Sequence, residues 1–171
     1  MLEIVTSLSE LNMSQLKQVY EESISTLAMN RYSKFHENLQ ILNAEQDFYA
    51  DVSAFFDVAG AEYALWISDG RYVSAIRLEP VDNGHLLTSF ETAPTARSKG
   101  FGKMLMKAVV ESVSRNKKSC IYSHIDESNV SSLKVHQHCG FRSLQYPAVF
   151  VDGSVQKDYV TYVFDIKDPP M

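Results

Sequence analysis

Hydrophobic residues in the first part of the chain recur at two different spacings. Residues 2–8 are strand-like, and after them apolar side chains recur near the spacing of one helix face. This helical set is Leu11, Leu16, Val19, Tyr20, Ile24 and Leu27. A second helix is indicated over 44–56, where Phe48, Val52, Phe55 and Phe56 fall on one side. The sequence up to residue 60 therefore predicts one strand followed by two helices.

From residue 62 the pattern changes to that of short strands. Strand-like runs cover 62–67, 72–78 and 85–92. They are separated by Ser68-Asp69-Gly70 and Asp82-Asn83-Gly84, which are both strong turn sequences. Because such tight turns join strands that pair with each other, an antiparallel meander is predicted.

A strongly amphipathic helix follows the meander after a glycine-rich loop. Its apolar positions recur at steps of three and four; they are Phe101, Met104, Leu105, Ala108, Val109 and Val113. The pair Lys117-Lys118 is expected to end this helix. Further on we predict a strand over 120–125, a helix over 129–138 that ends at Gly140, and a hairpin of 141–151 and 159–166 that turns at Asp152-Gly153.

Helices and strands that alternate after a meander imply an α/β fold with a mixed, mostly antiparallel central sheet and helices on both faces. The chain has 171 residues, of which 45% are hydrophobic and 22% charged. This composition suits one compact domain over 1–171 with a hydrophobic core.

Residues 97–103 place the sequence Arg-Ser-Lys-Gly-Phe-Gly-Lys between a predicted strand and the start of the amphipathic helix. Glycine lets the backbone approach a ligand closely, and the first N–H groups of a helix lack partners within it and carry positive partial charge. The loop is therefore suited to bind phosphate. A P-loop is excluded because Arg97 and Met104 stand where it needs Gly and Ser or Thr, and a dinucleotide fingerprint is excluded because residue 105 is Leu.

Two motifs in the expected order resemble those of the GCN5-related N-acetyltransferase (GNAT) family. Arg97 begins an Arg-x-x-Gly-x-Gly sequence three residues after Pro94, and this sequence resembles the family's loop for the pyrophosphate of acetyl-CoA. Asn129 stands eleven residues before Gly140-Phe141, as in the family's second motif. The resemblance covers roughly residues 70–165.

The resemblance implies both a fold and an acyl donor. In the GNAT-like fold the strands before and after the loop splay apart and admit the pantetheine arm of acetyl-CoA, with 61–171 as the cofactor-binding core and 1–60 on the acceptor side. Main-chain groups of 90–92 are implied to pair with pantetheine and to polarise the thioester carbonyl. The implied cofactor-binding residues are Phe90, Glu91, Thr92, Arg97, Ser98, Lys99, Gly100, Phe101, Gly102, Lys103, Asn129 and Ser132. The implied reaction is direct transfer of acetyl to a primary amine.

Two histidines are candidates for acid and base. His136 stands where the family motif has a tyrosine that protonates the departing thiolate, and an imidazolium is a competent acid near neutral pH. The alternative is that His136 only lines the tunnel and the thiolate leaves unassisted. His124 stands where some family members have a glutamate base, but a histidine on a strand can equally be a core or surface residue.

Other family members place a catalytic glutamate early in the strand before the loop. That position is Leu86 here, which cannot act as a base. Strand alternation is expected to turn its neighbour His85, and also Glu91, toward the other face of the sheet.

Metal binding is not expected. His136 and His138 are two positions apart, so on a helix they point about 200° away from each other and cannot share one ion. Cys139 is interpreted as a small packing residue. With Cys120 it makes up the two cysteines of the chain, which do not suggest a disulfide framework. Without a signal-peptide pattern or a long apolar run, a cytoplasmic location is expected.

The net charge of −5 is unevenly divided. Residues 1–75 hold 11 Asp and Glu against 4 Lys and Arg, a balance of −7, whereas 76–171 hold 10 against 12, a balance of +2. The second part suits a phosphate-rich cofactor, and the acidic first part favours a cationic acceptor. Between the two predicted helices stand Arg31, Tyr32, Phe35 and His36, which the resemblance implies to be part of one wall of the acceptor pocket; the alternative for each is a surface loop. A pI near 5.5 without a basic stripe argues against nucleic acid.

Because the tyrosine and the glutamate of the family motifs are missing, a non-catalytic acyl-CoA-binding module is the alternative to an N-acetyltransferase. A regulatory or oligomer-forming protein that uses only the fold is a third class. The expected partner is a small-molecule or peptide amine, without nucleic acid or membrane, and a homodimer stays open.

Overall fold

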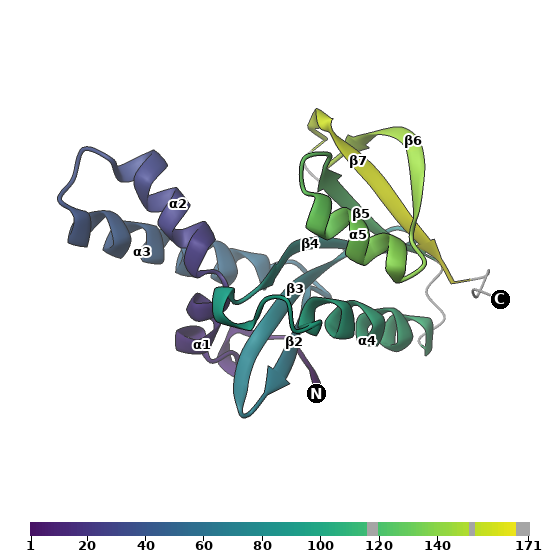
Figure 1. Ribbon diagram of the computed structural model, residues 1–171, viewed down its shortest axis with the longest axis horizontal. Helices are drawn as coiled ribbons and strands as arrows, with labels where there is room; N and C mark the ends of the chain where they lie inside the picture. Colours follow the sequence, from purple (N-terminus) through teal and green to yellow (C-terminus); the bar gives the residue numbers. More distant parts are fainter. Residues whose placement is uncertain (116–119, 151–152, 167–171) are drawn as a thin grey trace.

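A computed structural model describes residues 1–115, 120–150 and 153–166. Within them seven strands form one sheet in the order β1-β2-β3-β4-β5-β7-β6 (Figure 1). The strands are β1 (Leu2–Val5), β2 (Glu62–Ser68), β3 (Arg71–Val81), β4 (Gly84–Thr92), β5 (Cys120–Asp126), β6 (Arg142–Val149) and β7 (Val155–Asp165). All described pairs of neighbouring strands are antiparallel except β4 and β5, which are parallel. The predicted mixed, mostly antiparallel sheet is therefore confirmed.

Helices cover both faces of the sheet. They are α1 (Met13–Val19), α2 (Glu21–Tyr32), α3 (Glu37–Phe55), α4 (Phe101–Arg115) and α5 (Val130–His138), with single 3₁₀ turns at Leu8–Glu10 and Pro94–Ala96. One buried cluster joins α1, α2 and α3 to the sheet, and a second joins α4 to its other face, where side chains of α5 also pack. The two clusters confirm the predicted layers. In Figure 1 the hairpin of α2 and α3 projects to one side of the sheet, and the lobe of α5, β6 and β7 rises on the other.

The chain before residue 60 differs from the predicted elements. The first strand ends at Val5, because the Glu10 carboxylate accepts hydrogen bonds from the N–H groups of Thr6 and Ser7 at 2.6 and 3.1 Å and starts a 3₁₀ turn. The predicted first helix is divided at Tyr20 into α1 and α2. The second begins at Glu37 and not near Ala44, because its first turns carry exposed apolar residues that break the expected pattern.

The helix after the glycine loop also differs in detail. Met104 is 46% exposed, whereas Met106, which the pattern omitted, is completely buried. The helix is described to Arg115, so its predicted end at Lys117-Lys118 lies outside the described residues, as do Val151 and Asp152 of the last hairpin.

Strands β4 and β5 separate where the resemblance implies. Their parallel pairing runs only from Gly84 opposite Cys120 to Leu87 opposite Ser123. Beyond this point β4 continues beside β3 and β5 continues beside β7. The expected splayed strand pair is thereby confirmed.

A bulge near the end of β4 reverses the alternation of its side chains. Ala75 pairs with Glu91 but Arg77 pairs with Thr88, so the single residue between them on β3 lies opposite two residues of β4. One of these two is Ser89, whose φ is +49° and whose carbonyl oxygen accepts a 2.5 Å hydrogen bond from Tyr20 Oη. An extra residue in one strand changes which face the following side chains occupy.

Because of the bulge, the alternation predicted for Glu91 is wrong. Phe90 and Thr92 now face α4, and Glu91 faces α2, where its carboxylate accepts a hydrogen bond from Ser23 Oγ. Glu91 thus shares the face of Ala75, which packs in the cluster with α1, α2 and α3. By the same alternation this is also the face of Leu86.

Candidate functional site

The glycine loop forms a tight turn in front of α4. Ser98 and Gly100 have φ values of +62° and +81°, in the left-handed region that favours glycine. Met104 N donates to Gly100 O at 3.0 Å, the first bond of the helix. The N–H groups of residues 101–103 come before that bond and therefore have no partner within the helix. They point outward from its N-terminus, where the helix dipole is positive.

A cavity of about 850 Å³ lies against this loop. It is lined by all of the predicted cofactor-binding residues except Lys99, whose Nζ donates to Thr95 O at 3.2 Å. Its other lining residues are Glu22, Ser23 and Thr26 of α2, together with Ala96, Ser131, Lys134 and Val135. The structure thus brings the two sequence motifs to one site and adds a wall from α2, which no motif signalled.

The second motif places another helix start at the cavity. Asn129 caps α5, because its Oδ1 accepts a hydrogen bond from Ser132 N at 3.0 Å. Both residues line the cavity, as do Lys103 and Lys134. Two helix N-termini and two ammonium groups therefore border one cavity, an arrangement that favours an anionic ligand such as a pyrophosphate.

Gly102 is required by the close approach of α4 to the end of β4. A Cβ atom at this position would lie 3.0 Å from Thr92 Oγ1 and 3.1 Å from Phe90 Cζ. The small residue keeps both side chains in place where the end of β4 borders the cavity.

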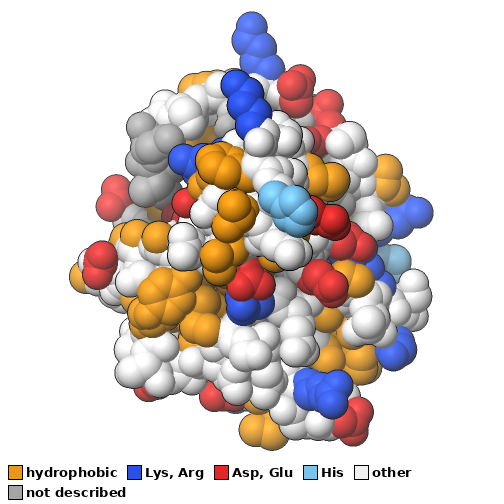
Figure 2. Space-filling model, turned by 90° about the vertical axis from the view of Figure 1, so that its left-hand side faces the viewer, with side chains coloured by type: hydrophobic (Ala, Val, Ile, Leu, Met, Phe, Trp, Pro, Cys, Tyr) orange, Lys and Arg blue, Asp and Glu red, His pale blue; other side chains and the backbone are white. Residues whose placement is uncertain are grey.

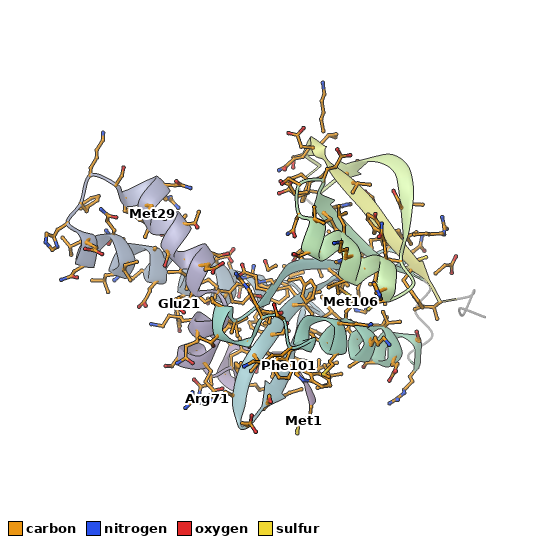
Figure 3. The ribbon with its side chains drawn as sticks, in the orientation of Figure 1. Met1, Glu21, Met29, Arg71, Phe101 and Met106 are labelled. Atoms are coloured by element: carbon orange, nitrogen blue, oxygen red, sulfur yellow. The ribbon has the colours of Figure 1, made fainter. Side chains whose placement is uncertain are left out.

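The α2 side of the cavity is acidic. Burial raises the pKa of the Glu91 carboxyl, while the hydrogen bond from Ser23 and the charge of Arg97 act in the opposite direction. Glu22 forms an ion pair with Arg97 at 2.6 Å, and Arg97 Nε also donates to Thr92 O at 3.2 Å. Figure 3 shows the starts of α2 and α4, at the labelled Glu21 and Phe101, on either side of this region.

His136 lies beneath the cavity and not among its lining residues. His136 is only 1% exposed. Its ring packs against the rings of Phe141, Phe90 and Tyr162, at centroid distances of 5.0, 6.0 and 6.2 Å. Its Nδ1 lies 2.8 Å from the Ser132 carbonyl oxygen, which can only accept, so Nδ1 carries the proton of the neutral ring. Burial lowers the pKa of His136. An acid role would require this buried ring to gain a second proton. The predicted acid role of His136 stays a prediction.

His124 is held by the last two strands. Its Nε2 lies 2.9 Å from the Val149 carbonyl oxygen and must donate to it, so Nδ1 of the neutral ring accepts from Thr161 Oγ1 at 3.0 Å. Burial lowers the pKa of this ring, which packs 4.9 Å from that of Phe150. Both ring nitrogens are engaged, and His124 is not among the residues that line the cavity. Its base role likewise stays a prediction.

The expected acceptor wall is only partly a loop. Arg31 and Tyr32 belong to the last turn of α2, and both bind Asp47 of α3, at 2.8 and 2.6 Å. A second hollow of about 230 Å³ lies between these helices and shares Ser23 with the main cavity. Among the described residues no group of three or more His, Cys, Asp or Glu is placed to hold a metal ion. No helix in the described part of the chain is long and apolar enough to cross a membrane.

The comparisons with known proteins agree with this geometry. The model of the acetyltransferase (GNAT) family matches residues 19–141, and the chain belongs to this family. No significant match to a curated protein sequence was found.

Several solved structures share the fold. The IAA acetyltransferase from Bacillus cereus aligns with a TM-score of 0.64 at 15% identity, over 96% of this chain and 98% of its own. The ribosomal-protein-S18-alanine N-acetyltransferase from Escherichia coli aligns with a TM-score of 0.61 at 15% identity, over 97% and 94%. A phosphinothricin acetyltransferase from Sinorhizobium meliloti, in complex with acetyl-CoA, aligns with a TM-score of 0.63 at 17% identity, over 96% and 88%.

Proposed function

We propose that the protein is an N-acetyltransferase that moves acetyl from acetyl-CoA to a primary amine of a small molecule or peptide. The observation that carries this proposal is that the end of β4, beyond its pairing with β5, and the glycine loop line one cavity. Its volume of about 850 Å³ falls within the usual range of roughly 300–1,000 Å³ for ligand sites. Family membership supports acetyl transfer in general.

In this proposal the loop end of the cavity binds the pyrophosphate of the donor. The N–H groups of residues 101–103 and the start of α5 supply the donors, and Lys103 and Lys134 supply positive charge. The main chain of 90–92 lies beyond the last residue of β4 that pairs with β5, so its polar groups are proposed to bind the pantetheine arm and to polarise the thioester.

We further propose Glu91 as the base for the acceptor. An amine must be neutral to attack the thioester carbon, and a carboxylate with a raised pKa is a better proton acceptor than an ordinary one. In the balanced reaction the amine nitrogen forms a bond to the acyl carbon, the C–S bond breaks, one proton of the amine passes to Glu91, and coenzyme A leaves as the thiol after taking up a proton.

A thiol-release assay tests the proposed function. The protein is mixed with acetyl-CoA and a panel of amines that includes polyamines, aminoglycosides, lysine-containing peptides and peptides with free N-termini, and coenzyme A release is recorded. Release that depends on one class of amine is the expected result. If no amine stimulates release although acetyl-CoA raises the thermal unfolding temperature, transfer is the wrong function.

That second outcome would favour the non-catalytic acyl-CoA-binding module. The observation in its favour is the position of the two histidines, since neither His124 nor His136 lines the cavity. The Glu91 carboxylate on the cavity wall is the reason that we prefer catalysis.

The cytoplasmic location that we infer from the sequence stays a proposal of the same kind, and a homodimer stays open. Cys120 and Cys139 are free thiols, as such a location allows.

A further inference from the structure

The Arg97–Glu22 ion pair spans the cavity wall between the cofactor loop and α2. Arg97 belongs to the loop that is proposed to bind pyrophosphate, and Glu22 is the second residue of α2, the helix on the acceptor side. Both side chains line the cavity. Their 2.6 Å contact therefore joins the two halves of the site.

The guanidinium of Arg97 is already committed in two directions. Its Nε donates to Thr92 O at 3.2 Å, which anchors it to the end of β4, and its Nη1 donates to Glu22. A phosphate group bound at the loop is a stronger anionic partner than one exposed carboxylate, because it carries more charge and more acceptor oxygens. A phosphate that takes the Nη1 side of the guanidinium therefore displaces Glu22 from it.

When Arg97 binds a phosphate in place of Glu22, the acceptor side of the cavity becomes more negative. The charged groups that face this part of the cavity are Glu22, Glu91 and Arg97. The positive charge of Arg97 acts on the Glu91 carboxyl as well as on Glu22. Once phosphate neutralises Arg97, Glu22 and Glu91 remain as two carboxylates on either side of Ser23. Such a pair attracts an ammonium group.

We propose that Glu22 is an acceptor-binding residue for the ammonium group of a cationic amine, and that Arg97 blocks it until the pyrophosphate of the donor displaces this contact. The proposal rests on the proposed function and adds to it an order of binding and the side chain that enforces it. Donor binding creates the acceptor subsite, so a cationic amine binds well only to the donor complex.

The first test needs only coenzyme A as the probe. Titration calorimetry at low ionic strength compares the wild type with Glu22→Gln and with the matched control Glu21→Gln, which removes the same charge from the preceding residue of α2, a residue outside the cavity lining (Figure 3). The ion pair is exposed, with side chains 47% and 57% accessible, so its loss should tighten coenzyme A binding only about twofold to fivefold. Glu21→Gln should leave the affinity unchanged.

A double-mutant cycle separates competition from simple charge repulsion. Arg97→Gln should weaken coenzyme A binding, and adding Glu22→Gln in that background should give no gain. The inference is overturned if Glu22→Gln binds no more tightly than Glu21→Gln, as expected if Arg97 bridges Glu22 and phosphate together. It is also overturned if the gain persists without Arg97.

The second test uses the amine that the panel identifies. Glu22→Gln should raise the KM for this amine at least about threefold with kcat changed less than about twofold, and Glu21→Gln should change neither. An unchanged KM in Glu22→Gln would remove the ammonium contact. A wild-type protein that binds no coenzyme A would instead refute the proposed function, whereas normal binding without the Glu22 effects refutes only this inference.

Discussion

At the scale of single residues, the character of the site depends on where one carboxylate points. Glu91 faces Ser23 and the cavity because Ser89, two positions earlier, adopts a left-handed backbone and inserts an extra residue into β4. In a regular strand without the extra residue, Glu91 would lie on the opposite face of the sheet, the one that α4 covers and that Phe90 now faces. Burial there raises the pKa of its carboxyl, which suits a proton acceptor.

Replacement of Glu91 tests its proposed role. Glu91→Gln should lower kcat at least about 100-fold, because the amide accepts no proton, and should leave coenzyme A affinity within about twofold. The base is active when deprotonated, so wild-type activity should fall as the pH drops through a pKa above that of an ordinary glutamate. Glu91→Gln should lose this acidic limb in a pH profile of kcat/KM.

Glu79→Gln is the matched control for Glu91→Gln. Glu79 also lies in a strand and accepts a hydrogen bond from a hydroxyl group, that of Thr88 at 2.6 Å, but it does not line the cavity. It should keep wild-type turnover and profile. Equal kcat values and an intact acidic limb in Glu91→Gln would show that another group takes the proton.

At the scale of elements, the break between α1 and α2 and the bulge in β4 support each other. Tyr20 is the residue at which the two helices meet, and its buried hydroxyl donates to the carbonyl of Ser89 at 2.5 Å. The same hydroxyl accepts from Tyr63 Oη at 3.3 Å. The helix break therefore places the Tyr20 hydroxyl, a hydrogen-bond donor, beside the Ser89 carbonyl in the bulge, where the regular strand pairing is interrupted.

Removal of that donor should affect both stability and turnover. Tyr20→Phe leaves the Ser89 carbonyl without this bond, so the free energy of unfolding should fall by about 1–3 kcal/mol in urea titrations. Because the bulge orients Glu91, kcat should fall as well.

Tyr72→Phe provides the comparison for Tyr20→Phe. The Tyr72 hydroxyl is also partly buried and bonded to the main chain, accepting from Asn12 N at 3.3 Å, but it has no link to β4. It should destabilise the fold without lowering kcat. If Tyr20→Phe keeps full turnover at a temperature where it is folded, the bulge does not depend on this bond.

At the scale of the whole molecule, charge and shape are arranged around the cavity. The −7 balance of residues 1–75 belongs to the side that contributes α2 and α3, and the loop proposed to bind phosphate belongs to the rest. Figure 2 views the molecule from the side of the α2–α3 hairpin and shows acidic, basic and hydrophobic side chains interspersed on that face. The large exposed hydrophobic residues of these two helices and their loop are Met29, Phe35, Leu39, Ile41, Leu42 and Tyr49.

Long-range attraction should give cationic acceptors an advantage that salt removes. The kcat/KM for a cationic amine should exceed that for a neutral or acidic amine at low ionic strength, and it should fall as salt rises from about 20 to 300 mM, because the screening length shortens to below about 10 Å. The value for a neutral amine should change little over the same range. Salt-independent kinetics with a cationic amine would limit the role of the acidic surface to solubility.

The sequence by itself determined the fold class, the meander and the two helix starts, because the signals for these features are local. Hydrophobic periodicity selects strand or helix, turn residues such as Asp69 and Gly84 join the strands, and Gly100 with Asn129 set the backbone in front of α4 and α5. The same motifs named most of the side chains that now line one cavity.

Only the tertiary structure decided what surrounds those side chains. The direction of Glu91 depends on a bulge that a hydroxyl 69 positions away in the sequence supports, and the partner of Arg97 comes from a helix without any motif. His124 and His136 occupy family motif positions, yet their hydrogen bonds and burial come from strands and rings distant in sequence. Such features arise from contacts between segments that are far apart along the chain, so no local pattern of residues can specify them.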